Sequence, residues 1–83
     1  MLFNNIDKST KMEILLENLV LREKNVYLWI IKLGIDPSEF DPDTFEVEQA
    51  GLSDQAIIEE RQHLKSAINA LGIINAQISL LEE

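Results

Sequence analysis

Several residue types that would point to a particular class of protein are absent from this chain or scarce in it. The 83 residues include no cysteine, which excludes disulfides, thiolate metal sites and a thiol nucleophile. There are three glycines and two prolines, so long regular elements can form with few breaks. No glycine-rich phosphate loop is present, and there is a single histidine. We therefore expect a protein that is not an enzyme and holds no cofactor.

Long apolar runs are also lacking. The longest covers residues 26–31, whereas a helix that crosses a bilayer needs about 20 apolar residues. Residues 1–6 carry no basic region ahead of an apolar stretch and do not resemble a secretion signal. These features predict a cytoplasmic protein without a membrane partner.

Cations are missing from the middle of the chain. The formal net charge is −8, and residues 34–60 contain nine acidic residues and no lysine or arginine. Such a charge distribution repels phosphate backbones and anionic lipids, so direct nucleic-acid binding is disfavoured. It attracts a basic protein surface instead. The carboxylates that we expect to contact such a partner are those of Asp36, Glu39, Asp41, Asp43, Glu46 and Glu48.

The chain does contain two apolar ladders with seven-residue spacing. They consist of Met12, Leu19, Val26 and Leu33 and of Ile57, Leu64, Leu71 and Ile78. This repeat is typical of helices that pack along their length. It predicts an all-α fold in one domain over residues 1–83, an antiparallel two-helix hairpin.

Capping signals predict the limits of the first helix. Thr10 and Glu13 fit a capping box at its start, and Gly34 can supply the left-handed residue that follows its last turn. The first helix should therefore run over about 10–33. The lead of residues 1–9 is expected to lie as a strap over the bundle.

The second helix should follow an acidic connector over 34–53. Ser53 is its expected cap, and its apolar ladder stays in phase across Gly72, which favours one continuous helix over about 54–82. The connector contains two Asp-Pro pairs, each followed by a phenylalanine. Because Asp-Pro is a helix-start signal, we expect two short helical turns pinned by these rings.

The apolar stripes of both helices are wider than a single partner helix needs. A chain of this length also buries a smaller share of its unfolded surface than a larger domain does, and association is a common remedy. Two hairpins could bury their stripes in a four-helix bundle, which predicts a homodimer. The alternative is a monomer whose connector covers the surplus apolar surface. The residues that we expect in the self-association surface are Leu19, Val26, Ile30, Leu64, Leu71 and Ile78.

Two glutamates interrupt the apolar stripes. Glu23 belongs to the first stripe and Glu60 to the second, and His63 follows Glu60 by about one helical turn. If Leu33 lies level with Asp54 in the hairpin, the two glutamates lie at similar heights. A glutamate on one helix and Glu-x-x-His on the next form half of a ferritin-like di-metal site, and a dimer would supply the other half.

A plainer interpretation is that Glu60 pairs with Arg22 or Lys24 and that Glu23 points to solvent. We favour this pairing over a metal site, because an isolated buried carboxylate is costly. The sequence as a whole indicates a small non-catalytic interaction module that self-associates and docks a basic partner, as an adaptor, chaperone or inhibitor. The alternatives are a metal-binding ferritin-like bundle and an acidic inhibitor that imitates nucleic acid.

Overall fold

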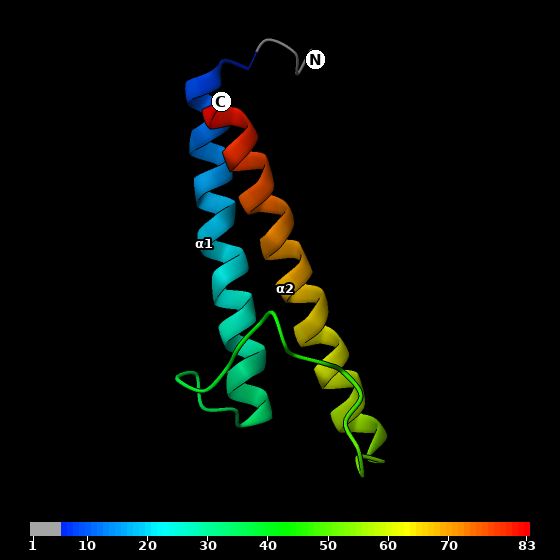
Figure 1. Ribbon diagram of the computed structural model, residues 1–83. Helices are drawn as coiled ribbons and strands as arrows, with labels where there is room; N and C mark the ends of the chain where they lie inside the picture. The colour runs from blue at the N-terminus through cyan, green and yellow to red at the C-terminus, as the bar shows by residue number, and fades with distance from the viewer. Residues whose placement is uncertain (1–5) are drawn as a thin grey trace.

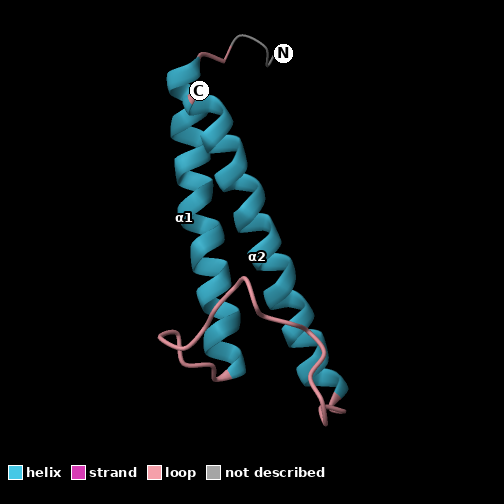
Figure 2. Cartoon of the chain, in the orientation of Figure 1, coloured by secondary structure: helices cyan, strands magenta, loops and turns pink. Residues whose placement is uncertain are grey.

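The computed structural model describes residues 6–83 and contains two long α-helices, α1 (Lys8–Leu33) and α2 (Gln55–Glu82). They run antiparallel, and the connector lies at the end of the molecule opposite the two termini (Figure 1). No strand occurs within residues 6–83, as the colouring of Figure 2 shows. The prediction of an all-α fold with two helices packed against each other is confirmed.

The start of α1 differs from the predicted capping box. The N-cap is Asp7, whose carboxylate accepts a hydrogen bond from the backbone N–H of Thr10 at 2.7 Å. Thr10 therefore lies in the first turn, so its prediction as the cap is wrong. Of the residues expected to form a strap, 1–5 lie outside the described part of the chain, and α1 already includes Lys8 and Ser9.

The end of α1 follows the expected chemistry. Gly34 adopts a left-handed conformation with φ 70°, and its N–H bonds to the carbonyl of Ile31. The next N–H, that of Ile35, reaches back to the carbonyl of Ile30 at 3.1 Å. This pattern satisfies carbonyls of the last turn and directs the Ile35 side chain against the core.

α2 begins after Asp54, not after the predicted cap Ser53. The Asp54 carboxylate accepts a hydrogen bond from the N–H of Ala56 at 3.0 Å. The helix then continues through Gly72 without a break. A Cβ at Gly72 would meet no atom within 4 Å, so packing does not require glycine at this position.

The main core lies near the connector end of the hairpin, where α1 and α2 move apart (Figure 1). Val26 and Ile30 of α1 pack with Leu64 and Ala67 of α2, and Leu64 has no exposed surface. The connector folds back across the gap between the helices (Figure 1). The partly buried residues that complete this core are Trp29, Leu33, Ile35, Phe40, Phe45, Ile68 and Leu71.

Each Asp-Pro pair of the connector starts a turn, and neither turn is long enough to be assigned as a helix. The Asp36 carboxylate accepts from the N–H of Ser38 at 3.0 Å, and that of Asp41 accepts from the N–H of Asp43 at 2.9 Å. In the first turn the Glu39 N–H also bonds to the Asp36 carbonyl at 3.0 Å. The two expected turns are therefore present at the Asp-Pro pairs, but each is a single turn and not a helix.

Two cations of α2 hold the connector in place. Arg61 donates from Nε to the carbonyl of Val47 at 2.8 Å and from Nη2 to the carbonyl of Glu46. Its guanidinium also lies 4.7 Å from the centre of the Phe45 ring. Lys65 Nζ donates to the carbonyl of Phe45 at 3.2 Å. We call these contacts the connector clasp.

By length and composition alone, α2 would suffice to cross a membrane, with a mean hydropathy of 1.2 over 18 residues. Core helices of soluble proteins pass the same test. In this hairpin α2 contributes Leu64, Ala67, Ile74 and Ile78 to the buried core, which accounts for part of its apolar character. The absence of a membrane partner stays a prediction.

Candidate protein-interaction site

The helix α1 has apolar side chains on nearly every side, and α2 covers one of these sides. A helix that is apolar all round is normally surrounded by protein. In residues 6–83, seven of the ten exposed large hydrophobic residues belong to α1. They are Ile14, Leu16, Val20, Leu21, Tyr27, Leu28 and Ile31, with exposed fractions from 44% to 71%.

These seven residues fall on two separate faces. Because an α-helix turns by about 100° per residue, residues 16, 20, 27 and 31 lie within about 60° of one another. We call Leu16, Val20, Tyr27 and Ile31 the lateral strip. Residues 14, 21 and 28 are seven apart and lie within about 40° of one another, and their mean direction differs by about 110° from that of the strip. We call Ile14, Leu21 and Leu28 the back ladder.

The lateral strip is continuous with a cavity beneath the connector. This cavity has a volume of about 260 Å³, and Tyr27 of the strip forms part of its wall. Glu23 is the only acidic residue that lines it. The remaining lining residues are apolar, namely Val26, Ile30, Pro37, Phe40, Pro42, Ile68 and Leu71. The cavity can accept an apolar side chain, with a carboxylate beside it to receive a cation.

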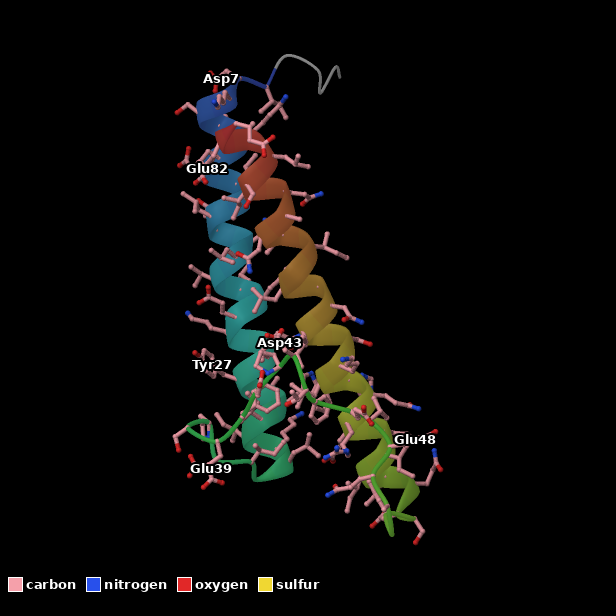
Figure 3. The ribbon with its side chains drawn as sticks, in the orientation of Figure 1. Asp7, Tyr27, Glu39, Asp43, Glu48 and Glu82 are labelled. Atoms are coloured by element: carbon pink, nitrogen blue, oxygen red, sulfur yellow. The ribbon has the colours of Figure 1, made fainter. Side chains whose placement is uncertain are left out.

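The connector adds exposed negative charge beside this cavity. All six carboxylates that we predicted to contact a basic partner are exposed. Figure 3 shows Glu39 on the side of Tyr27, Glu48 on the side of α2 and Asp43 between them. Hydrogen bonds from the hydroxyl and the N–H of Ser38 lower the pKa of Asp36, so that carboxylate stays charged near neutral pH.

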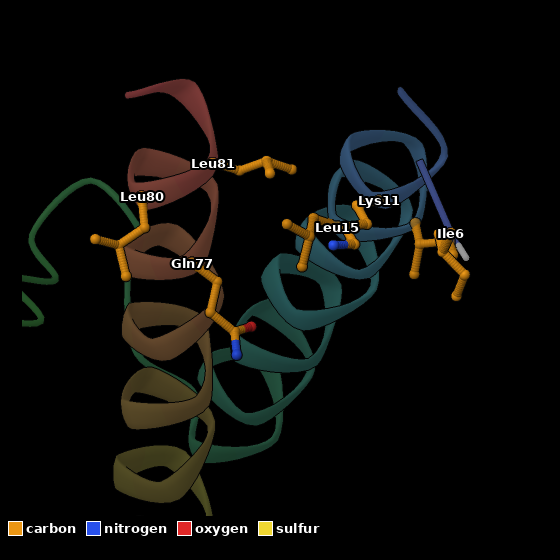
Figure 4. A pocket seen from close by; sticks show the side chains of 7 residues that line it. Ile6, Lys11, Leu15, Gln77, Leu80 and Leu81 are labelled. Atoms are coloured by element: carbon orange, nitrogen blue, oxygen red, sulfur yellow. The ribbon is translucent and has the colours of Figure 1, made fainter. Parts of the chain in front are cut away.

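A second groove lies between the helices at the end of the molecule that carries the termini. Its volume is about 440 Å³, and Leu15 of α1 and Leu81 of α2 point into it from opposite walls (Figure 4). The remaining lining residues are Ile6, Lys11, Ile14, Gln77 and Leu80. It is an open apolar groove with one cation, and it is separated from the acidic connector by the length of the hairpin (Figure 1).

The residues predicted for self-association lie mainly in the contact between α1 and α2. Val26, Ile30, Leu64 and Ile78 are buried in this contact. The two others, Leu19 and Leu71, are partly buried. The seven-residue ladders thus account for the hairpin itself, and none of the six residues is among the exposed large hydrophobic residues. The signal for the back ladder was present in the sequence, because residues 14, 21 and 28 have the same seven-residue spacing.

The register of the hairpin separates the metal candidates. The Trp29 ring stacks on the His63 ring with centroids 4.7 Å apart, so residue 23 lies level with residue 69. Our expected register placed it level with residue 64. Glu23 and Glu60 are therefore nine residues apart along α2, or about 14 Å at 1.5 Å per residue. Within residues 6–83 no group of three metal-ligating side chains is close enough to hold an ion.

The predicted ion pair between Arg22 and Glu60 is wrong for the same reason. Arg22 Nη1 donates to the carbonyl of Ala70 at 2.7 Å, ten residues beyond Glu60 on α2. Lys32, on the last turn of α1, lies over the Trp29 ring at 4.6 Å from its centre. Of these two cations, Arg22 therefore bonds across to α2, whereas Lys32 contacts a ring of its own helix.

The fold and its exposed surfaces define a class, that of small helical hairpins whose first helix has exposed apolar faces. Comparisons with protein-family models, with curated proteins and with solved structures gave no match.

Proposed function

We propose that this chain is a non-catalytic interaction module that binds a basic amphipathic helix of a partner protein along the lateral strip of α1. The observation that supports this function is the position of the strip. Four exposed apolar side chains lie in one row that leads into an apolar cavity and then to the acidic connector. A partner helix with an apolar stripe and flanking cations would match all three features.

The apolar row supplies the affinity in this proposal. Val20 and Leu16 are about half exposed, and Tyr27 and Ile31 more than half. Covering the exposed part of four such side chains is worth about 3–6 kcal/mol before association costs are subtracted. An anchor side chain of the partner in the connector cavity would add to this contact. Such a surface is suited to a moderate, reversible complex.

The acidic connector supplies the selectivity. Carboxylates around Glu23 and Asp43 would attract lysine or arginine on the edges of the partner helix and repel acidic helices. Exposed charges of this kind act mainly on the association rate and are screened by salt. The proposed partner is therefore a protein helix, and adaptor, chaperone and inhibitor differ in what the partner does afterwards.

Two helical peptides with the same leucine face test this function, one with a lysine polar face and one with a glutamate polar face. We expect the lysine peptide alone to bind, with an affinity that falls as salt rises. Val20→Glu should weaken binding about tenfold or more, because it places a charge within the strip. The matched control is Ile73→Glu on α2, a residue that is 58% exposed and outside the strip.

The same variants can then be used to capture the natural partner from the native cell. Loss of a captured protein with Val20→Glu, but not with Ile73→Glu, would support the strip as its binding site. Equal losses with both variants, or equal binding of the two peptides, would contradict the proposed function.

A further inference from the structure

The back ladder of α1 is symmetric about its middle residue. Leu21 lies seven residues after Ile14 and seven residues before Leu28, and it is the most exposed of the three at 64%. Suppose that a second α1 packs antiparallel with a two-fold axis at Leu21. Residue n of one helix then lies level with residue 42 − n of the other. Ile14 then meets the partner's Leu28, and Leu21 meets the partner's Leu21. Each apolar residue of the ladder then faces an apolar residue of the partner.

The charges beside the ladder obey the same symmetry. Glu17 and Lys24 lie on one flank, about 50° from the ladder. In the antiparallel pair Glu17 is level with position 25 of the partner, one residue from the partner's Lys24. The two-fold axis repeats this contact, so two ion pairs form. Within α1 neither residue has an opposite charge three or four positions away, where a helical ion pair would form.

The opposite flank carries two amides with the same relation. Asn18 and Asn25 lie about 50° from the ladder on its other side. Asn18 comes level with a position one residue from the partner's Asn25. Asn18 already donates from Nδ2 to the carbonyl of Ile14 at 3.0 Å, which leaves its Oδ1 to accept from the partner's amide.

These flanks also select the direction of packing. In an antiparallel two-fold pair each flank meets the same flank of the other helix. In a parallel two-fold pair the flank with Glu17 and Lys24 would meet the flank with Asn18 and Asn25, and no ion pair would form. Only the antiparallel arrangement pairs acid with base and amide with amide.

We infer that the back ladder is the interface of an antiparallel homodimer whose two-fold axis passes by Leu21. The occupant is a second copy of this chain, because apolar, charged and amide residues are complementary to themselves under one axis. The ladder direction differs by about 135° from the direction of the core side chains of α1. The two α1 helices therefore lie inside a four-helix assembly, with each α2 outside. The inference goes beyond the proposed function, and it uses a face that the lateral strip does not.

A charge-swap series tests the ion pairs by analytical ultracentrifugation at several protein concentrations. Glu17→Lys alone or Lys24→Glu alone places like charges together, and we expect the dimer dissociation constant to rise about tenfold or more. The double variant Glu17→Lys/Lys24→Glu should restore the dimer. Both residues are exposed in the hairpin, so helical content should not change.

Cross-linking tests the direction, since the chain has no cysteine of its own. Leu21→Cys should cross-link with itself through a short bismaleimide. Ile14→Cys and Leu28→Cys should each give no cross-linked product alone under the same treatment and should cross-link when mixed. A protein that is monomeric at all concentrations, a dimer that the charge swaps leave unchanged, or Ile14→Cys that cross-links alone would overturn the inference.

The dimer and the partner site can fail separately. Val20→Glu lies on the lateral strip, so it should leave the sedimentation of the dimer unchanged while it weakens the lysine peptide. Loss of the dimer in the Glu17→Lys variant should leave peptide binding in place. If Val20→Glu dissociates the dimer, the interface lies on the wrong face and the inference is overturned.

Discussion

At the scale of single residues, short polar side chains decide where the elements begin. The Asp7 and Asp54 carboxylates cap the two helices, and Asp36 and Asp41 start the turns of the connector. Each takes an N–H that would otherwise lack a partner. Thr10 and Ser53 were plausible caps by residue type, but the actual caps lie three residues before Thr10 and one residue after Ser53. The sequence offers several competent side chains near each start, and only the folded backbone selects among them.

The cap of α1 makes stability depend on pH. The Thr10 N–H bonded to Asp7 lowers the pKa of that carboxyl below its ordinary value. Its stabilising effect is therefore complete above the ordinary pKa of an unfolded aspartate and is lost as the pH falls through the lower folded pKa. Asp7→Asn should keep the cap and flatten this acidic dependence of the melting temperature, whereas Asp7→Ala should lower the melting temperature at neutral pH. Thermal melts followed by circular dichroism across the acidic pH range measure both effects. If Asp7→Asn leaves the fall of the melting temperature at acidic pH unchanged, Asp7 is not its cause.

At the scale of elements, the connector is a packed part of the core and not a free linker. It contributes Phe40 and Phe45, whose ring centroids are 5.7 Å apart, and the connector clasp of α2 fixes its backbone. The pairing of α1 with α2 followed from their ladders, but the axial register did not. A seven-residue ladder fits its partner at more than one offset. The sequence therefore defines which faces pack but not the axial position of one helix relative to the other. The register differs by five residues from the expected one. Glu23 and Glu60 are therefore too far apart along the hairpin to share a metal ion within one chain.

Removal of the clasp should loosen the connector without unfolding the helices. Arg61→Met keeps an apolar stem beside Phe45 but removes the hydrogen bonds to the carbonyls of Val47 and Glu46. Leaving the partly buried carbonyl of Val47 without a donor should lower the free energy of unfolding by about 1–3 kcal/mol. Urea denaturation measures the loss, and hydrogen exchange should locate it in residues 36–48. The control is Gln62→Met at an exposed neighbouring position, and an equal loss in both variants would assign the effect to the added methionine.

At the scale of the whole molecule, α1 is better suited to the centre of an assembly than to the edge of a hairpin. Six hydrophobic side chains are buried among residues 6–83, whereas ten large ones are exposed. The sequence indicated surplus apolar surface, but it assigned self-association to residues that the hairpin itself uses, such as Val26 and Leu64. The angular position of each residue around α1 follows from the sequence, but which of these positions are exposed is known only once the side covered by α2 is known. That is why the lateral strip and the back ladder become visible once the fold is in place.

If a second chain covers the back ladder, the stability of the fold must depend on protein concentration. Folding and dimer formation are then linked by mass action, so the melting temperature should rise as the protein is concentrated. Leu21→Lys places two like charges at the two-fold axis and should abolish that rise while the dilute hairpin keeps its melting temperature, because Leu21 is 64% exposed in the single chain. Ile73→Lys, at a similarly exposed position of α2, is the matched control and should keep the dependence. Calorimetry over a series of concentrations distinguishes these cases, and a melting temperature of the unaltered protein that does not change with concentration would show that the hairpin is stable as a single chain.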